Sequence, residues 1–131
     1  MPGRTEAKVS DMARAKKIVI ADDNREMCDL VQDIFSENGY EVDCVHNGYE
    51  LMSYLENNSP SVIILDLMMP EKDGISVLGS LKQLSPYSRI IIYTGYQEYE
   101  KSVYARAVDR FLVKGKSIEE LIEAVDELAV A

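Results

Sequence analysis

Five short apolar runs alternate with amphipathic stretches along this 131-residue chain, and this alternation limits the possible folds more than any other feature. Three runs are apolar throughout, as is typical of strands buried on both faces of a parallel sheet; they cover residues 18–21, 62–65 and 90–93. The run at residues 40–46 alternates polar and apolar side chains, which predicts a strand at an edge of the sheet. Residues 110–113 form the fifth predicted strand.

Each predicted strand is followed by a stretch with apolar residues at helical spacing. The predicted helices cover residues 24–38, 49–57, 75–84, 98–108 and 117–130. Gly39 ends the first of them, and Ser117 with Glu120 makes a capping box at the start of the last. Five strand–helix units in strict alternation predict an α/β sandwich, with a parallel sheet between two layers of helices and right-handed crossovers.

The size and charge of the chain limit its organisation and its partners. The length suits one compact domain, assigned to residues 16–131, preceded by a flexible N-terminal tail at residues 1–15. A net charge of −9 argues against nucleic acid or an anionic membrane as a direct partner. No apolar run has the length of a membrane span, and Cys28 and Cys44 match no metal-ligand spacing, so we expect a cytoplasmic protein with two reduced thiols.

Polar side chains that could carry chemistry stand where the predicted strands end. Asp22 and Asp23 follow the first strand, Asp66 the third, Thr94 ends the fourth and Lys114 follows the fifth. Ligands of parallel α/β sheets bind outside the carboxyl ends of the strands, so these residues are predicted to meet in one pocket. The alternative is that they are solvated residues such as end strands in any α/β protein. That alternative is weaker because all five stand at strand ends.

A pocket of this composition has a defined chemistry. Three neighbouring carboxylates repel one another unless a cation joins them, and Mg²⁺ prefers oxygen ligands that can bridge to phosphate. Lys114 supplies a compact positive charge for a phosphoryl oxygen, and Thr94 supplies a hydroxyl that can donate to the same group. A carboxylate held between Mg²⁺ and a lysine can attack phosphorus and form an acyl phosphate.

Four sequence blocks, in this order and at these spacings, resemble a known signature: Asp22-Asp23-Asn24, the segment from Asp66 to Gly74, Thr94-Gly95, and Phe111-Leu112-Val113-Lys114. The family is that of the CheY-like response regulator receiver domains of two-component signalling. The resemblance runs from about Lys17 to the C-terminus. It implies a flavodoxin-like (βα)5 fold with strand order 2-1-3-4-5.

The resemblance also implies a role for each acidic residue. Asp66 is expected to accept a phosphoryl group from a sensor histidine kinase. Asp23, Asp66 and the backbone carbonyl of Met68 are expected to bind Mg²⁺ directly, and Asp22 through a metal-bound water.

The switch residues follow from the same resemblance. Lys114 is expected to pair with the acceptor and then with its phosphate, while Thr94 moves to a phosphoryl oxygen. Phe111 is expected to change its rotamer with Thr94. The face made by the fourth helix, fifth strand and fifth helix (residues 98–130) is expected to bind a downstream protein target or a second copy of the chain.

The sequence departs from the family pattern at two places. Gly115 stands where the family usually has proline, so we expect a trans bond after Lys114 and an altered loop, because a cis non-proline bond costs roughly 2.5–4 kcal/mol. Met68 and Tyr96 are bulky at positions that influence access of the hydrolytic water in this family. They predict slow loss of the phosphoryl group.

Two other functions fit the sequence less well. An Asp-nucleophile phosphohydrolase would carry a second Asp two residues after the nucleophile as general acid and base, but that position is Met68. A receiver-like module that binds partners without phosphorylation would tend to lose the acidic residues, which are all present here. The only histidine, His46, excludes histidine-based phosphorelay and is expected to end the second strand in solvent. The chain is expected to be either a single-domain regulator or a receiver from a longer one.

Overall fold

The computed structural model describes residues 16–115 and 117–129, and it contains a five-stranded parallel sheet in the order β2-β1-β3-β4-β5. The strands are β1 (Lys17–Ala21), β2 (Glu41–Val45), β3 (Val62–Leu65), β4 (Arg89–Thr94) and β5 (Arg110–Val113). Every residue of β3 is buried, whereas β2 and β5 form the two edges. The predicted fold, strand order and edge position of residues 40–46 are confirmed. The predicted tail at residues 1–15 lies outside the described residues.

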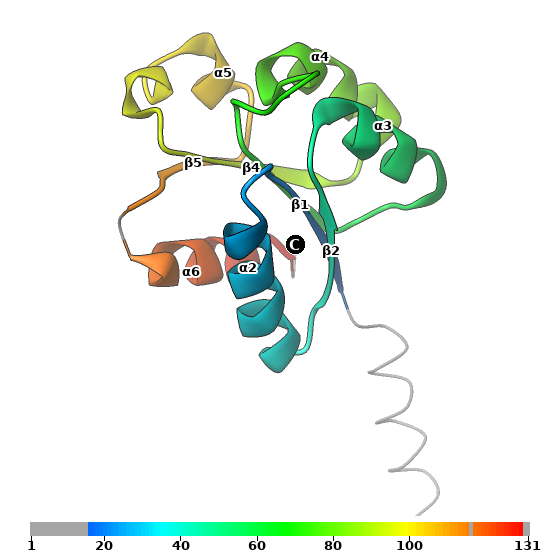
Figure 1. Ribbon diagram of the computed structural model, residues 1–131, viewed down its shortest axis with the longest axis vertical. Helices are drawn as coiled ribbons and strands as arrows, with labels where there is room; N and C mark the ends of the chain where they lie inside the picture. Colours follow the sequence, from blue (N-terminus) through cyan, green and yellow to red (C-terminus); the bar gives the residue numbers. More distant parts are fainter. Residues whose placement is uncertain (1–15, 116, 130–131) are drawn as a thin grey trace, which may run out of the picture.

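Helices cover both faces of the sheet (Figure 1). On one face lie α2 (Arg25–Glu37) and α6 (Ile118–Ala129), and on the other α3 (Gly48–Asn57), α4 (Gly74–Leu84) and the short α5 (Val103–Arg106). Two apolar clusters fill the spaces between the layers, one around Ile18, Ile20 and Phe35 and the other around Val19 and Ile63. Neighbouring residues of β1 thus point to opposite faces, as strand geometry requires. No helix of these described ranges is long and apolar enough to cross a membrane.

Side-chain caps fix where the helices begin, and two of these caps border the site. The side-chain oxygen of Asn24 accepts a hydrogen bond from the Met27 N–H, so α2 starts directly after the Asp22-Asp23 pair. Asp73 caps α4 in the same way through the Ser76 N–H. The capping box predicted for Ser117 and Glu120 is replaced by a simpler cap, in which the Ser117 hydroxyl accepts from the N–H of Glu119.

The predicted helix over residues 98–108 was wrong, because the structure breaks it into a 3-10 turn, η1 (Gln97–Tyr99), and α5. Ser102 is the physical reason. Its hydroxyl bonds the Tyr99 carbonyl at 2.5 Å and accepts from the Ala105 N–H at 3.4 Å. A serine that bonds nearby backbone groups in this way ends one turn and caps the next.

Candidate functional site

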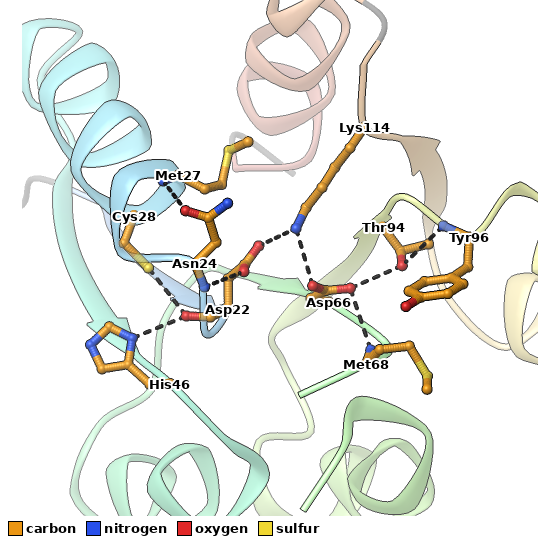
Figure 2. Close-up of polar contacts among 10 residues, drawn as sticks. All are labelled: Asp22, Asn24, Met27, Cys28, His46, Asp66, Met68, Thr94, Tyr96 and Lys114. Carbon is orange, nitrogen blue, oxygen red and sulfur yellow. Dashed lines mark hydrogen bonds and ion pairs between the residues drawn. The ribbon is translucent and has the colours of Figure 1, made fainter. Parts of the chain in front are cut away.

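The structure brings together the polar residues that end the strands (Figure 2). Asp22 directly follows β1, Asp66 follows β3, Thr94 ends β4 and Lys114 follows β5. Parallel strands present their carboxyl ends at one edge, so side chains up to 92 positions apart in the sequence meet there. The predicted convergence of these residues is therefore present.

Asp66 is held through both oxygens of its carboxylate. Thr94 Oγ1 donates to Oδ1 over 2.9 Å, and the Met68 N–H donates to the same oxygen over 3.4 Å. Lys114 Nζ donates to Oδ2 over 3.1 Å. The carboxylate is thereby fixed in orientation at the mouth of the site.

Lys114 also binds the second buried carboxylate. Its Nζ lies 2.5 Å from Asp22 Oδ2, and the backbone N–H of Asn24 donates to Asp22 Oδ1 over 2.9 Å. Burial raises the pKa of the Asp22 carboxyl and outweighs the opposing hydrogen bond from Lys114. Burial would lower the pKa of Lys114, but the hydrogen bond to Asp22 and the charges of Asp66 and Asp22 exceed it, so that pKa is raised. The ammonium ion is therefore kept charged between two carboxylates.

Three carboxylates form a candidate metal site. Asp22, Asp23 and Asp66 each place an oxygen within 4.8 Å of the others; Asp22 and Asp66 are buried and Asp23 is exposed. One lysine offsets only part of their charge, and the exposed Asp23 opens the cluster to solvent. A hard divalent cation that keeps several waters, such as Mg²⁺, fits this set of donors.

These residues belong to a region that matches the family model described as response regulator receiver domain, over residues 18–126. The chain belongs to the response regulator receiver domain family. The match covers nearly all of the sheet and of the helices described above, and the family is generally one of signalling domains.

Curated relatives are identical to this receiver domain at about 30% of the aligned positions. The chemotaxis protein CheY of Bacillus subtilis is 31% identical over 116 residues, which are 86% of this chain and 97% of that protein. Response regulator MprA of a Mycobacterium species is 30% identical over 108 residues, 81% of this chain. The receiver domain spans only 47% of MprA, so the matched region is one part of that regulator.

Solved structures agree with the fold. Response regulator protein TrrA of Thermotoga maritima, solved in complex with Mg²⁺ and BeF, has a TM-score of 0.80 and 31% identity, covering 86% of this chain and 98% of that one. A CheY-like receiver domain protein of Methanospirillum hungatei has a TM-score of 0.82 and 28% identity, covering 88% and 94%.

The loop after Lys114 begins with a trans bond and a glycine in the left-handed region. The described residues contain no cis peptide bond, in agreement with the trans bond predicted before Gly115. Gly115 has a φ of 92°, in the left-handed region that glycine adopts without strain. Proline, whose φ is fixed near −65°, cannot occupy this conformation. Lys114 nevertheless reaches both buried carboxylates.

The remaining predicted site residues lie around this centre. Val113 is the register partner of Thr94, and Phe111 stands two residues before it, so Phe111 and Thr94 share one face of the sheet. Phe111 is half-buried against the apolar cluster of that face. Met68 and Tyr96 are 39% and 43% exposed and flank the acceptor in Figure 2.

Two residues that support Asp22 were missed by sequence reasoning. His46 Nδ1 lies 3.0 Å from the backbone oxygen of Asp22, and the thiol of Cys28 donates to the same oxygen over 3.4 Å. Arg25 approaches His46 Nε2 at 3.2 Å. A carbonyl only accepts and a guanidinium only donates, so these two contacts fit the tautomer of His46 that carries its proton on Nδ1. His46 is half-buried in this network, and the prediction that it ends β2 in solvent was wrong.

This network leads to a prediction about His46. Replacement by Leu is expected to weaken divalent-cation binding about tenfold, as is common when a residue that orients a ligand is lost. Replacement by Asn is expected to keep most of the affinity, because its amide nitrogen can take the place of Nδ1. Calorimetric titration with Mg²⁺, beside the melting temperature of each variant, checks this. Equal affinities for the Leu and Asn variants would contradict it.

Proposed function

We propose that this receiver domain accepts a phosphoryl group on Asp66 from a sensor histidine kinase, with Mg²⁺ as cofactor, in the cytoplasm. The observation that carries the proposal is the arrangement around Asp66. Asp66 is 6% exposed, its carboxylate receives Thr94 and Lys114 on opposite oxygens, and two further acids lie beside it. Formation of an acyl phosphate requires these groups: a nucleophile, a cation for the phosphoryl oxygens and a hydroxyl donor.

The chemistry of the step is a displacement at phosphorus. An oxygen of Asp66 forms the new bond to phosphorus while the bond to the donor breaks, and the acyl phosphate results. Bound Mg²⁺ would supply positive charge to the phosphoryl oxygens; Asp22, Asp23, Asp66 and the carbonyl of Met68 would hold it. Lys114 is already charged and within reach of Asp66, so it can bind an oxygen of the transferred group without a large movement.

Readout is proposed to pass from Thr94 to Phe111. The Thr94 hydroxyl is fully buried and now donates to Asp66, and a phosphoryl oxygen would offer it a more strongly charged acceptor. Its movement would free space on the face that it shares with half-buried Phe111. The proposed output surface consists of α5, β5 and α6, which contact a downstream protein.

The cation requirement gives the experiment that tests this function. Asp23 is exposed, so Asp23→Asn should fold normally but bind Mg²⁺ at least about tenfold more weakly, since a direct charged ligand is lost. Phosphoryl acceptance from a small phosphodonor should fall in parallel and stop in chelator. Asp33→Asn, an exposed acid on α2, is the matched control. Full acceptance in chelator would contradict the proposal.

Met68 and Tyr96 are proposed to slow hydrolysis of the acyl phosphate. Both side chains are partly exposed and flank Asp66, where they can restrict the approach of water. The double variant Met68→Ala/Tyr96→Ala is expected to lose the phosphoryl group several-fold faster. Decay of the adduct, followed by mass after donor removal, measures this. Rapid decay in the wild type, unchanged in the variant, would contradict the idea.

The alternatives are less well supported. A phosphohydrolase lacks its second acid, because the residue two positions after Asp66 is Met68. A receiver-like module that works without phosphorylation would not need Thr94 and Lys114 bonded to a nearly buried carboxylate.

A further inference from the structure

A groove of about 330 Å³ runs along the outer edge of the sheet. All four residues of β5 line it, with Glu100 on one side and three glutamates and an alanine of α6 on the other. β5 is the last strand of the sheet, and Figure 1 shows it at the outer margin between α5 and α6. The groove is therefore the open edge of the sheet itself.

Half of the backbone groups of β5 are directed into this groove. The N–H of Lys114 donates to the Thr94 carbonyl over 2.8 Å, and Thr94 pairs with Val113 in the register of the ladder between β4 and β5. In a parallel ladder, successive residues alternate between the two neighbouring strands. Leu112 and Lys114 therefore direct their backbone groups to β4, whereas those of Phe111 and Val113 face away from it, where an added strand could pair with them.

The walls of the groove are acidic. Glu100, Glu120, Glu123 and Glu127 line it, and Arg110, the only basic residue among the described residues of the lining, already forms an ion pair with Glu127. Glu120, Glu123 and Glu127 are exposed and lie on one side of α6 at spacings of three and four residues.

The fold offsets the acidic side of α6 only in part. α6 contains no basic residue, so within the helix nothing compensates the repulsion among its glutamates. Glu120 stands in the first turn, where a negative charge favours the helix dipole, and Glu127, in the last turn, is paired with Arg110 of β5. In the described part of the chain Glu123 forms no ion pair, so its charge has no such explanation in the fold.

We propose that the β5 groove binds an extended, basic segment of the downstream partner, which adds to the sheet beside β5 as a sixth strand. Backbone pairing to Phe111 and Val113 would supply affinity, and Lys or Arg side chains would pair with Glu120 and Glu123. This inference names the partner chemistry of the proposed output surface, and so rests on the proposed function.

A second copy of the chain fits this groove poorly. A two-fold contact would place the same patch on both sides. The α6 glutamates of one copy would then approach those of the other. The groove chemistry therefore favours a basic partner over self-association.

The test uses a labelled, end-blocked peptide of alternating lysine and valine, with binding followed by fluorescence anisotropy at low salt. The variant Glu120→Gln/Glu123→Gln should bind it about three- to tenfold more weakly, the range expected for two exposed ion pairs. The control Glu119→Gln/Glu56→Gln removes the same charge from exposed positions outside the groove and should bind like the wild type. Equal binding by both double variants would overturn the proposal.

A second peptide tests strand addition. Methylation of alternate backbone nitrogens removes the ladder donors but keeps the charge, and should abolish most of the binding. In the amide NMR spectrum, the unmodified peptide should shift Arg110–Val113 most. Undiminished binding of the methylated peptide, or NMR shifts elsewhere in the protein, would overturn the proposal. Sedimentation that shows a wild-type dimer, lost in the Glu120→Gln/Glu123→Gln variant, would also overturn it, because the groove would then bind a second copy of the chain.

Failure of this inference can be told from failure of the proposed function. Asp66→Asn cannot be phosphorylated but has an intact groove, so it should bind the peptide as the unphosphorylated wild type does. Peptide binding by wild type that accepts no phosphoryl group would contradict the proposed function but support the groove as a binding site. Phosphoryl acceptance without peptide binding would support the proposed function but contradict the groove as a binding site.

Discussion

Replacing Lys114 with Met is expected to remove detectable phosphoryl acceptance by Asp66 and, at the same time, to tighten Mg²⁺ binding. The first effect follows because Lys114, the one cationic side chain of residues 16–115 and 117–129 that contacts Asp66, lies 3.1 Å from it and is proposed to bind the transferred group. The second follows because its Nζ, 2.5 Å from Asp22, competes with a metal ion for the same carboxylates. Removing a unit charge this close should raise the affinity about tenfold or more.

The same variant should be less stable without metal. Asp22 and Asp66 are buried, and Lys114 offsets their charge. Removing one partner of a buried ion pair costs about 3 kcal/mol or more. Mg²⁺ should restore part of this loss because it binds only the folded cluster.

Thermal unfolding with and without Mg²⁺, calorimetric titration and intact mass after phosphodonor treatment measure these three effects. Lys101→Met, at an exposed position outside the site, is the control and should change none of them. Weaker Mg²⁺ binding by Lys114→Met would contradict this account of the site.

Replacing Gly74 with Ala is expected to destabilise the protein by about 3 kcal/mol or more, in the upper range for point mutants. A Cβ at this position would lie 2.2 Å from the backbone oxygen of Asp66 and 3.0 Å from Leu67 Cα. Both obstacles are backbone, so a side-chain rotation cannot relieve the clash. The loop that carries Asp66 would have to move, and phosphoryl acceptance should slow as well.

Gly79 offers a matched control in the same helix. A Cβ there would meet nothing within 4 Å. Gly79→Ala should therefore raise the free energy of unfolding by about 0.5–1 kcal/mol, since glycine is unfavourable inside a helix. Urea denaturation of the two variants beside the wild type checks the contrast. Equal stabilities for the two alanine variants would show that α4 can shift away from Asp66 without cost.

The order of the strands and the place of the site were predictable because local pattern and global fold agree. Val62–Leu65 is apolar throughout because it lies in the centre of the sheet, and Asp66 follows it because the sheet ends there. The strand order itself came from the resemblance, since periodicity does not say which strands are neighbours. The candidate site residues could be identified from the sequence alone, because all five, three acids with Thr94 and Lys114, stand at the ends of predicted strands.

What sequence reasoning missed depended on contacts between distant residues. His46 and Cys28 support the Asp22 carbonyl through bonds that no spacing in the sequence reveals. The break in the helix at residues 98–108 depended on the hydroxyl of Ser102, which competes for backbone groups within an otherwise helical pattern. The open edge of β5 was likewise a property of the assembled sheet rather than of residues 110–113 alone.

Intact-protein mass spectrometry after incubation with Mg²⁺ and a small-molecule phosphodonor, with wild type beside Asp66→Asn, shows directly whether Asp66 accepts a phosphoryl group. A single phosphoryl adduct is expected on the wild type, absent from the variant and from samples that contain chelator. Because Asn keeps the shape of Asp66 and removes a buried charge, the variant should remain folded, which its circular dichroism spectrum can establish. An adduct of equal yield on folded Asp66→Asn, or no adduct on folded wild type with any small donor or sensor kinase, would contradict the assignment of Asp66 as the phosphoacceptor.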